Sequence, residues 1–337
     1  MQQLKIAILS SIAWRTPPTA YGPWEQVASN HCEELVNLGH DVTLFATGNS
    51  VTNAKLCAVV PSGYAETQGM DAKVWECLHI SNLMEQAGDF DIIHNHFDFL
   101  PLTYSRLVKT PIVTTIHGFS SNKIVPVYKK YNDTSHYVSI SYSDRHNSLN
   151  YTANVYNGID SRQFTFNETS DDYLLFFGRI HPDKGTLDAC KIALATNKQL
   201  IIAGLIQDAD YYNQKIASLV DNNQIKYIGN VGPDKRNELL GKALAVLHPI
   251  HFDEPFGLSV AEAMMCGTPI IAYNRGSMPE IIKQNVTGYI VENLEEAINM
   301  VPKLKLLSRK DCRQHSLDNY SMHTMAKGYV EVYNKIL

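Results

Sequence analysis

Short apolar runs alternate with longer amphipathic stretches along this chain, and the alternation occurs twice. Amphipathic stretches in the first half predict helices at Trp24–Leu38, closed by Gly39, and at Ala72–Ala87. The apolar runs of that half predict strands at Lys5–Leu9, Val42–Ala46, Asp91–His94, Ile112–Ile116 and Tyr137–Ile140.

The pattern restarts after residue 161. Runs this apolar are typical of strands buried on both faces, as in parallel sheets covered by helices. The fold class is therefore α/β, with two Rossmann-like domains joined near 157–169 and a ligand cleft expected between them. The strands predicted in the second half are Tyr173–Phe177, Gln199–Ala203, Lys226–Ile228, Ala245–Leu247 and Pro269–Ala272.

The expected domains span residues 1–160 and 161–319, followed by a C-terminal segment over 320–337. In that segment, apolar side chains recur at helical spacing over 322–336, which predicts an amphipathic helix. It is either an ordinary terminal helix or one that crosses back to the first domain, and we expect the second arrangement.

Composition narrows the class of protein. A chain of 337 residues exceeds the roughly 250–300 residues at which single cores stop growing. No apolar run reaches the roughly 18 residues of a membrane span, and the N-terminus lacks the pattern of a signal peptide. The six cysteines are scattered without a C-x-x-C pair, which is typical of reduced thiols. We therefore expect a soluble, cytoplasmic protein.

Charge gives little reason to expect a polyanionic partner. The net charge is −5, so no nucleic acid is predicted as a partner. Lys123, Lys129 and Lys130 form a local basic cluster, which allows at most a peripheral contact with a membrane.

The densest chemical signal lies at residues 254–269, EPFGLSVAEAMMCGTP. Pro255 and Gly257 keep Glu254 outside a helix that begins near Leu258, whereas Glu262 lies within it. The amide groups at a helix start suit a phosphate, and carboxylates suit hydroxyl groups. Phosphate and polyol together indicate a nucleotide sugar; the plainer interpretation is a helix cap with two surface glutamates.

A second signal, GRIHPDKG at residues 178–185, directly follows a predicted strand. Arg179 lies at the strand's carboxyl end, and Lys184 is expected to open the next helix, so both cations can face one crevice. Each is suited to a diphosphate leaving group. The alternative is a solvated pair of cations.

Together with Thr115-Ile116-His117-Gly118 and the segment 155–160, VYNGID, these motifs resemble the retaining glycosyltransferases of family 4, which have the two-domain GT-B fold. The resemblance spans nearly the whole chain in the family's order. It implies a hexosyltransferase, with the acceptor on the first domain and a UDP- or GDP-type sugar on the second. The acceptor class, whether glycan, lipid-linked or small molecule, stays open.

The resemblance also assigns roles to individual positions. Glu254, with the backbone of Phe256 and Gly257, is similar to the group that holds donor-sugar hydroxyls, and Glu262 to the one that binds the ribose. The diphosphate clamp is implied at Arg179 and Lys184 with the N–H groups near Leu258, and His117 is placed near the reacting centre. Gly276 and Glu280 have a supporting role. No cofactor and no metal is expected.

In the first domain, Tyr21-Gly22-Pro23-Trp24-Glu25 is similar to a Tyr-Gly-Gly-x-Glu element of the family. Gly22 allows a phosphate to approach the backbone, but Pro23 has no N–H to offer. Trp24 and the nearby Trp14 either stack on an acceptor sugar or pack in the core.

Some residues also fit rival interpretations. Asp89-Phe90-Asp91 and Asp208-Ala209-Asp210 resemble metal-binding Asp-x-Asp pairs, but capping explains both. The run 94–98, HNHFD, is similar to the opening of dinuclear hydrolase sites, although no later histidines complete a zinc set. A scaffold that binds a nucleotide sugar or a protein partner without transfer is a further rival, and a nucleotide-sugar epimerase is the last.

Overall fold

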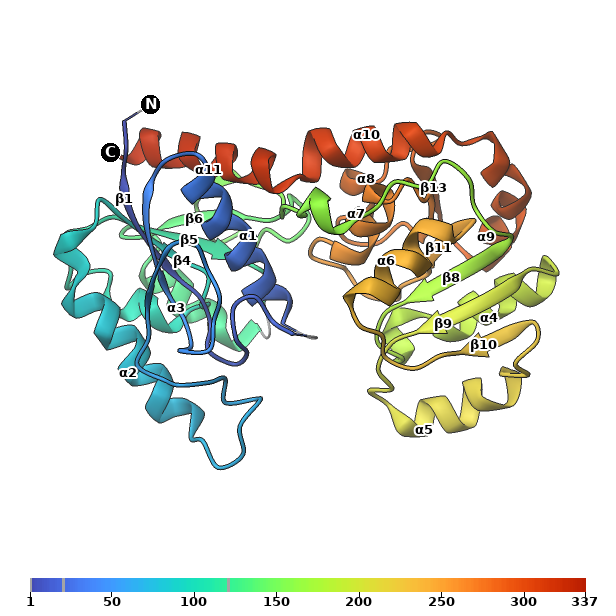
Figure 1. The fold of residues 1–337 in the computed structure, drawn as a ribbon, viewed down its shortest axis with the longest axis horizontal. Coiled ribbons are helices and arrows are strands. Elements are labelled where there is room, and N and C mark those ends of the chain that lie inside the picture. Colours follow the sequence, from blue (N-terminus) through green and yellow to red (C-terminus); the bar gives the residue numbers. More distant parts are fainter. Residues whose placement is uncertain (1, 20–21, 120–121) are drawn as a thin grey trace. The chain divides into compact units, whose positions relative to one another are not determined.

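The computed structural model describes residues 2–19, 22–119 and 122–337 and contains two compact units (Figure 1). The first unit comprises Met1–Gly158 and Met322–Leu337, and the second comprises Ile159–Ser321. Each unit is built around one parallel sheet, as expected for two Rossmann-like domains.

The first sheet has seven parallel strands in the order β3-β2-β1-β4-β5-β6-β7. The order reverses between β1 and β4, and at such a switch point the loops after the strands diverge and leave room for a ligand. The strands are β1 (Lys5–Leu9), β2 (Asp41–Phe45), β3 (Lys55–Cys57), β4 (Ile92–Asn95), β5 (Ile112–Ile116), β6 (His136–Ser139) and β7 (Tyr151–Asn154).

Helices on the first sheet include the last one of the chain. α11 (Met322–Ile336) packs against α1 (Pro23–Asn37), which confirms that the C-terminal helix returns to the first domain (Figure 1). Its apolar stripe is buried there, Tyr329 and Tyr333 included. The other helices and turns are α2 (Ala72–Glu85), α3 (Val125–Lys130), η1 (Ala87–Asp89), η2 (Leu100–Tyr104) and η3 (Asn122–Ile124).

The second sheet has six parallel strands in the order β10-β9-β8-β11-β12-β13, with its switch point between β8 and β11. Its strands are β8 (Tyr173–Phe177), β9 (Gln199–Ala203), β10 (Ile225–Tyr227), β11 (Ala245–His248), β12 (Ile270–Tyr273) and β13 (Gly288–Val291). Its helices are α4 (Thr186–Ala195), α5 (Ala209–Tyr211), α6 (Pro233–Lys242), α7 (Leu258–Met265), α8 (Met278–Ile281), α9 (Leu294–Met300) and α10 (Arg309–Tyr320), with turns η4 (Ser161–Gln163), η5 (Pro182–Lys184), η6 (Tyr212–Ile216), η7 (Ala217–Leu219) and η8 (Val301–Leu306).

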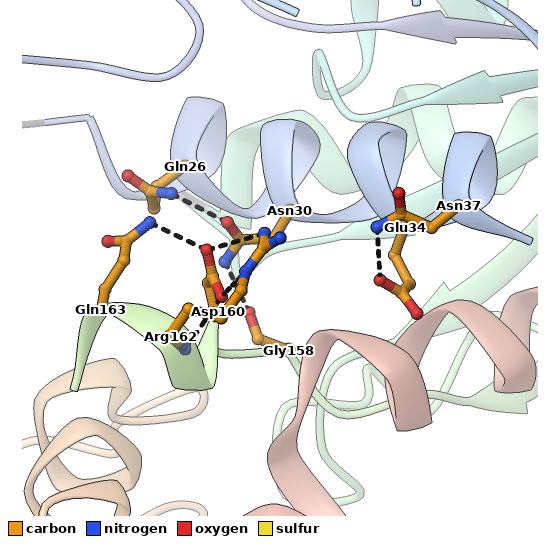
Figure 2. A network of polar contacts seen from close by, with 8 residues as sticks. All are labelled: Gln26, Asn30, Glu34, Asn37, Gly158, Asp160, Arg162 and Gln163. Carbon is orange, nitrogen blue, oxygen red and sulfur yellow. Dashed lines mark hydrogen bonds and ion pairs between the residues drawn. The ribbon is translucent and has the colours of Figure 1, made fainter. Parts of the chain in front are cut away.

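The segment between the units is anchored separately on each side (Figure 2). In the first unit, Asn30 Nδ2 on α1 donates to the carbonyl oxygen of Gly158 at 2.8 Å. In the second unit, Asp160 caps η4 and accepts hydrogen bonds from the side chains of Arg162 and Gln163. The N-G-I-D element therefore ends one unit and starts the next.

Three strands were not predicted, and all three lie at sheet edges. β3 and β7 flank the first sheet, and β13 ends the second. An edge strand is covered less than a central one, and the four residues of β7 are all only partly buried. The short, partly polar strands β3 and β7 are therefore hard to find in a search for apolar runs, whereas β13 is apolar and largely buried and was missed although it fits the pattern. Within the described residues, no helix combines the length and apolar character needed to cross a membrane.

Candidate functional site

Two loops of the second unit carry the predicted donor-site residues, one on each side of the switch point. Arg179 and Lys184 follow β8, and Glu254 follows β11. These strands are neighbours in the sheet, so residues about 70 positions apart meet at its carboxyl edge. One expectation was wrong: Lys184 does not open α4 but ends the short turn η5 before it, because Gly185 separates the two.

The centre of this site is an ion pair. Lys184 Nζ lies 2.7 Å from Glu254 Oε2, and each side chain is only 15% exposed. The ammonium group also lies 4.5 Å from the centre of the Phe252 ring, a cation–π contact. Because the pair is partly shielded from water, its attraction is stronger than that of an exposed ion pair.

Glycines allow the loops to approach closely enough to form this pair. A Cβ atom at Gly185 (φ 72°) would come 1.8 Å from the carbonyl oxygen of Pro249, just after β11. At Gly276 (φ 53°) a Cβ atom would come 2.3 Å from the Glu254 amide nitrogen. Ser277 N–H donates to the Glu254 carbonyl at 2.9 Å, so this loop fixes the backbone that carries the glutamate.

His248, the last residue of β11, was not predicted. Its Nε2 lies 3.8 Å from Glu254 Oε2 and makes no hydrogen bond with any described residue. Burial lowers the pKa of His248 to about 4, with the Glu254 carboxylate opposing the shift, so the ring is neutral at pH 7. The ion pair thus has a buried neutral imidazole beside it.

Arg179 lies in the same loop after β8 as Lys184, but it does not take part in the ion pair. Its guanidinium donates to Gln207 Oε1, and the side chain is partly exposed. The structure therefore brings Lys184 and Glu254 into direct contact, whereas the Arg179 guanidinium is hydrogen-bonded to Gln207 instead.

The predicted phosphate-binding helix start is present. Gly257 (φ 87°) caps α7, and the first hydrogen bond of that helix runs from the Val260 amide to the Gly257 carbonyl at 3.0 Å. The amides of Leu258 and Ser259 therefore precede the hydrogen-bonded ladder, as helix-start amides do. Phe256 is buried, and its carbonyl accepts from Ser277 Oγ at 2.9 Å.

Glu262 lies on α7 and is buried at 8% exposure. Arg236 on α6, which sequence reasoning missed, places Nη1 3.3 Å from Glu262 Oε1. Burial raises the pKa of Glu262, and the arginine opposes that shift. No sequence signal singles out Arg236; in the structure its Nε is buried without a partner among the described residues, and its guanidinium lies over the Phe164 ring.

In the first unit, Gly22 caps α1 with Pro23 at the first helical position. Its φ of 149° and the 2.9 Å that would separate a Cβ atom from Pro18 Cβ leave room for glycine alone. Tyr21, part of the same motif, lies outside the described residues. Glu25 in the first helical turn is buried and accepts from the Ser11 hydroxyl, and burial raises its pKa.

His117 follows β5 and belongs to a group of four buried histidines. Its Nε2 lies 2.9 Å from His96 Nδ1, and its ring stacks on Trp24 with 5.7 Å between centroids. Burial lowers the pKa of His117 and of His31 to about 3 and that of His94 and His96 well below the usual value. These imidazoles are neutral at pH 7.

The H-x-H-x-D run does not form a site of its own. Its aspartate, Asp98, accepts a hydrogen bond from the Tyr128 hydroxyl, while His94 and His96 gather with His31. The ligand atoms of the three histidines lie within 4.8 Å of one another. Each ring nitrogen already has a hydrogen-bond partner, so a metal ion would have to displace those contacts.

The Asp-x-Asp pairs have structural roles. Asp208 caps α5 by accepting from the Tyr211 amide at 2.8 Å, as predicted. Asp91 instead accepts from the Lys5 amide at 2.8 Å, at the start of the first sheet, which corrects the expectation of a cap.

A cavity of about 440 Å³ lies at the switch point of the first unit. Asp98 lines it with a φ of 99°, a left-handed conformation that aspartate rarely adopts. None of the described residues that line the cavity is a lysine or an arginine; they are Ser11, Ala13, Trp14, Pro23, Trp24, Glu25, Tyr64, Glu76, Phe97, Asp98, Phe99 and Leu100. The cavity is therefore aromatic and acidic.

Comparisons with known proteins agree with this architecture. Residues 159–323 match the family described as glycosyl transferases group 1, and residues 25–163 match glycosyltransferase family 4. The glycosyltransferase MJ1607 of Methanocaldococcus jannaschii is 24% identical over 98% of both chains. A glycogen synthase of Mycobacterium tuberculosis is 23% identical over 96% of this chain and 93% of its own.

Among solved structures, Anabaena HepE in complex with UDP and glucose superposes with a TM-score of 0.73 at 17% identity. The match covers 99% of this chain and 100% of HepE, and at this identity it shows a shared fold alone. The two family matches together span both sheets and the motifs at 178–185 and 254–269. The chain therefore belongs to the family 4 glycosyltransferases and has their GT-B fold.

Proposed function

We propose that this protein is a retaining hexosyltransferase that moves a sugar from a UDP- or GDP-type donor to a hydroxyl group without a metal ion. The observation that carries the proposal is the Lys184–Glu254 pair beside the start of α7. It places a cation, a carboxylate and free amides at one switch point. A diphosphate needs the cation and the amides, and sugar hydroxyls need the carboxylate.

In this proposal the donor binds to the second unit. Arg179, Lys184 and the amides of Leu258 and Ser259 hold the diphosphate, while Glu254 accepts hydrogen bonds from the sugar. Glu262 holds the ribose. The complex of HepE with UDP and glucose supports a donor of this class. The cleft between the two domains stays a prediction from the sequence.

The chemical step is dissociation of the sugar from the diphosphate. Lys184 and Arg179 stabilise the negative charge that grows on the leaving oxygen, and such stabilisation acts most strongly in the transition state. Attack by the acceptor on the same face of the sugar retains the anomeric configuration, with the leaving phosphate accepting the acceptor's proton. NMR of the initial product tests this step, and an inverted anomer would contradict it.

The basic experiment is incubation with a panel of nucleotide sugars, with and without EDTA, followed by detection of released nucleoside diphosphate. We expect release from one donor class, unchanged by EDTA. Binding without release, with every acceptor offered, would favour a scaffold instead.

The cavity of the first unit suggests the acceptor. Aromatic rings bind the apolar faces of sugars, and carboxyl groups bind hydroxyls. Glu25, Glu76 and Asp98 line it without a lysine or arginine among its described lining residues, so a phosphorylated acceptor would meet repulsion. We therefore propose an uncharged glycoside as the acceptor.

Glu76→Gln is expected to raise the acceptor KM about tenfold, because it weakens one hydrogen bond to a charged group. The donor KM should not change, since Glu76 lies in the first unit. Glu85→Gln, at the exposed end of the same helix, is the matched control. A panel of glycosides and sugar phosphates as acceptors checks the class; preference for sugar phosphates would refute it.

Glu262→Ala is expected to weaken nucleoside diphosphate binding by about 10–100-fold, as loss of a charged hydrogen bond to a diol does. Calorimetry with UDP, GDP and their 2′,3′-dideoxy analogues measures it. The wild type should prefer the ribonucleotide, and the variant should not. Glu238→Ala, which removes an exposed carboxylate on α6, is the control. Equal loss for both nucleotide forms would show that Glu262 does not bind ribose.

A further inference from the structure

A continuous chain of hydrogen bonds leads from the C-terminal helix to His117. Its members are buried side chains of the first unit, drawn from α1, α11, β4, β5 and the residues that follow these two strands. In order along the chain they are Tyr329, Thr115, His94, Tyr333, His31, His96 and His117.

The series of hydrogen bonds ends at the hydroxyl group of Tyr329. Tyr329 Oη lies 2.7 Å from Thr115 Oγ1, its sole hydrogen-bond partner among the described residues. Tyr329 is fully buried, and a buried O–H without an acceptor is costly. Its hydroxyl therefore donates to Thr115, whose own hydroxyl then donates to His94 Nε2 at 2.8 Å.

The same donor-to-acceptor direction continues through His94 and Tyr333. A neutral imidazole has one N–H and one lone pair, so His94 carries its proton on Nδ1. That nitrogen lies 2.5 Å from Tyr333 Oη, which accepts from it and donates to His31 Nε2 at 3.2 Å. His31 in turn carries its proton on Nδ1.

The last two bonds reach the site. His31 Nδ1 donates to His96 Nε2 at 3.0 Å, and His96 Nδ1 donates to His117 Nε2 at 2.9 Å. The opposite direction would leave one hydroxyl proton, that of Tyr329 or that of Thr115, without an acceptor among the described residues. His117 Nδ1 makes no hydrogen bond within the described ranges, so it is the nitrogen left for a ligand.

We propose that this chain fixes His117 in the tautomer with its proton on Nδ1, so that His117 presents a hydrogen-bond donor to substrate and not a base. Tyr329 and Tyr333 are then positioning residues, acting on the site from the last helix. The proposal deepens the proposed function and rests on it for the identity of the substrate. It agrees with a leaving phosphate, rather than this histidine, accepting the acceptor's proton.

NMR of ligand-free protein labelled with ¹⁵N-histidine tests the tautomer, since protonated and unprotonated ring nitrogens have well separated shifts. His117→Gln identifies the signals of that ring. We expect a protonated Nδ1 and an unprotonated Nε2. Protonation on Nε2 in the wild type would overturn the proposal without any variant.

Tyr329→Phe removes the donor that sets the direction, so we expect His117 to populate both tautomers and kcat to fall about tenfold at an unchanged donor KM. Tyr137→Phe is the matched control, because the Tyr137 hydroxyl is also buried but donates to the Tyr128 carbonyl at 2.8 Å, off the chain. Identical His117 spectra for wild type and Tyr329→Phe would refute the proposal. The spectra need no substrate, so a protein inactive with every donor yet showing this tautomer would contradict the proposed function alone.

Discussion

Lys184→Ala is expected to lower kcat by about 10²–10³-fold, the range found when one group that stabilises developing charge is removed. The variant loses the cation that lies 2.7 Å from Glu254 and leaves that carboxylate, only 15% exposed, without its partner. A diphosphate would then meet an uncompensated negative charge. Steady-state kinetics with the donor found in the nucleotide-sugar panel measures the effect.

Lys191→Ala is the matched control for this variant. Lys191 lies on the neighbouring helix α4 and pairs with Asp188 at 3.1 Å, with an exposed side chain. Its removal should leave kcat within about twofold, as for ordinary surface ion pairs. A kcat of Lys184→Ala within threefold of the wild-type value would contradict the placement of the diphosphate beside Lys184.

Acidification is expected to unfold the first unit near pH 5. Burial holds the pKa of His31 and His117 at about 3 and that of His94 and His96 well below the usual value, whereas an unfolded histidine titrates near 6.5. The unfolded state thus binds more protons below pH 6.5. The neutral histidines make their full contribution to folding stability above pH 6.5, and this contribution is lost as the pH falls below that value.

The expected slope is large. Each histidine that takes up a proton on unfolding removes about 1.4 kcal/mol of stability per pH unit, so four remove about 5.5 kcal/mol per unit, against a total of roughly 5–15 kcal/mol. Asp98 acts in the opposite sense, because burial raises its pKa to about 6 and its folded form gains stability as the pH falls toward 4. Burial also raises the pKa of Glu25 and Glu76 in the same unit, so these carboxyl groups reduce the slope that the four histidines produce.

Tryptophan fluorescence reports this transition selectively. The three tryptophans, Trp14, Trp24 and Trp75, all lie in the first unit. Urea titrations at pH 5–8 would give the number of protons taken up, and His31→Asn, if it folds, should reduce that number by one. A stability that is flat between pH 7 and pH 5 would show that the histidines are not held neutral.

The sequence predicts most of the frame because central parallel strands are continuous apolar runs, as β8 and β9 are. The meeting of Lys184 and Glu254 follows from their places after neighbouring strands. Arg236 and His248 were beyond reach, because nothing in their local sequence distinguishes them from ordinary polar residues. The bond between His94 and Tyr333 joins positions 239 residues apart, so it depends on how α11 packs against α1 and the sheet.

The return of α11 to the first unit has a consequence for biosynthesis. Residues 1–158 leave the ribosome long before 322–337, whereas the second unit is continuous in sequence. The second unit can therefore fold first, while the surface of α1 that packs against α11 stays uncovered until residues 322–337 have been synthesised. For separate expression of the first unit, residues 322–337 should be joined to 1–158 through a linker, since either piece alone lacks part of the core of that unit.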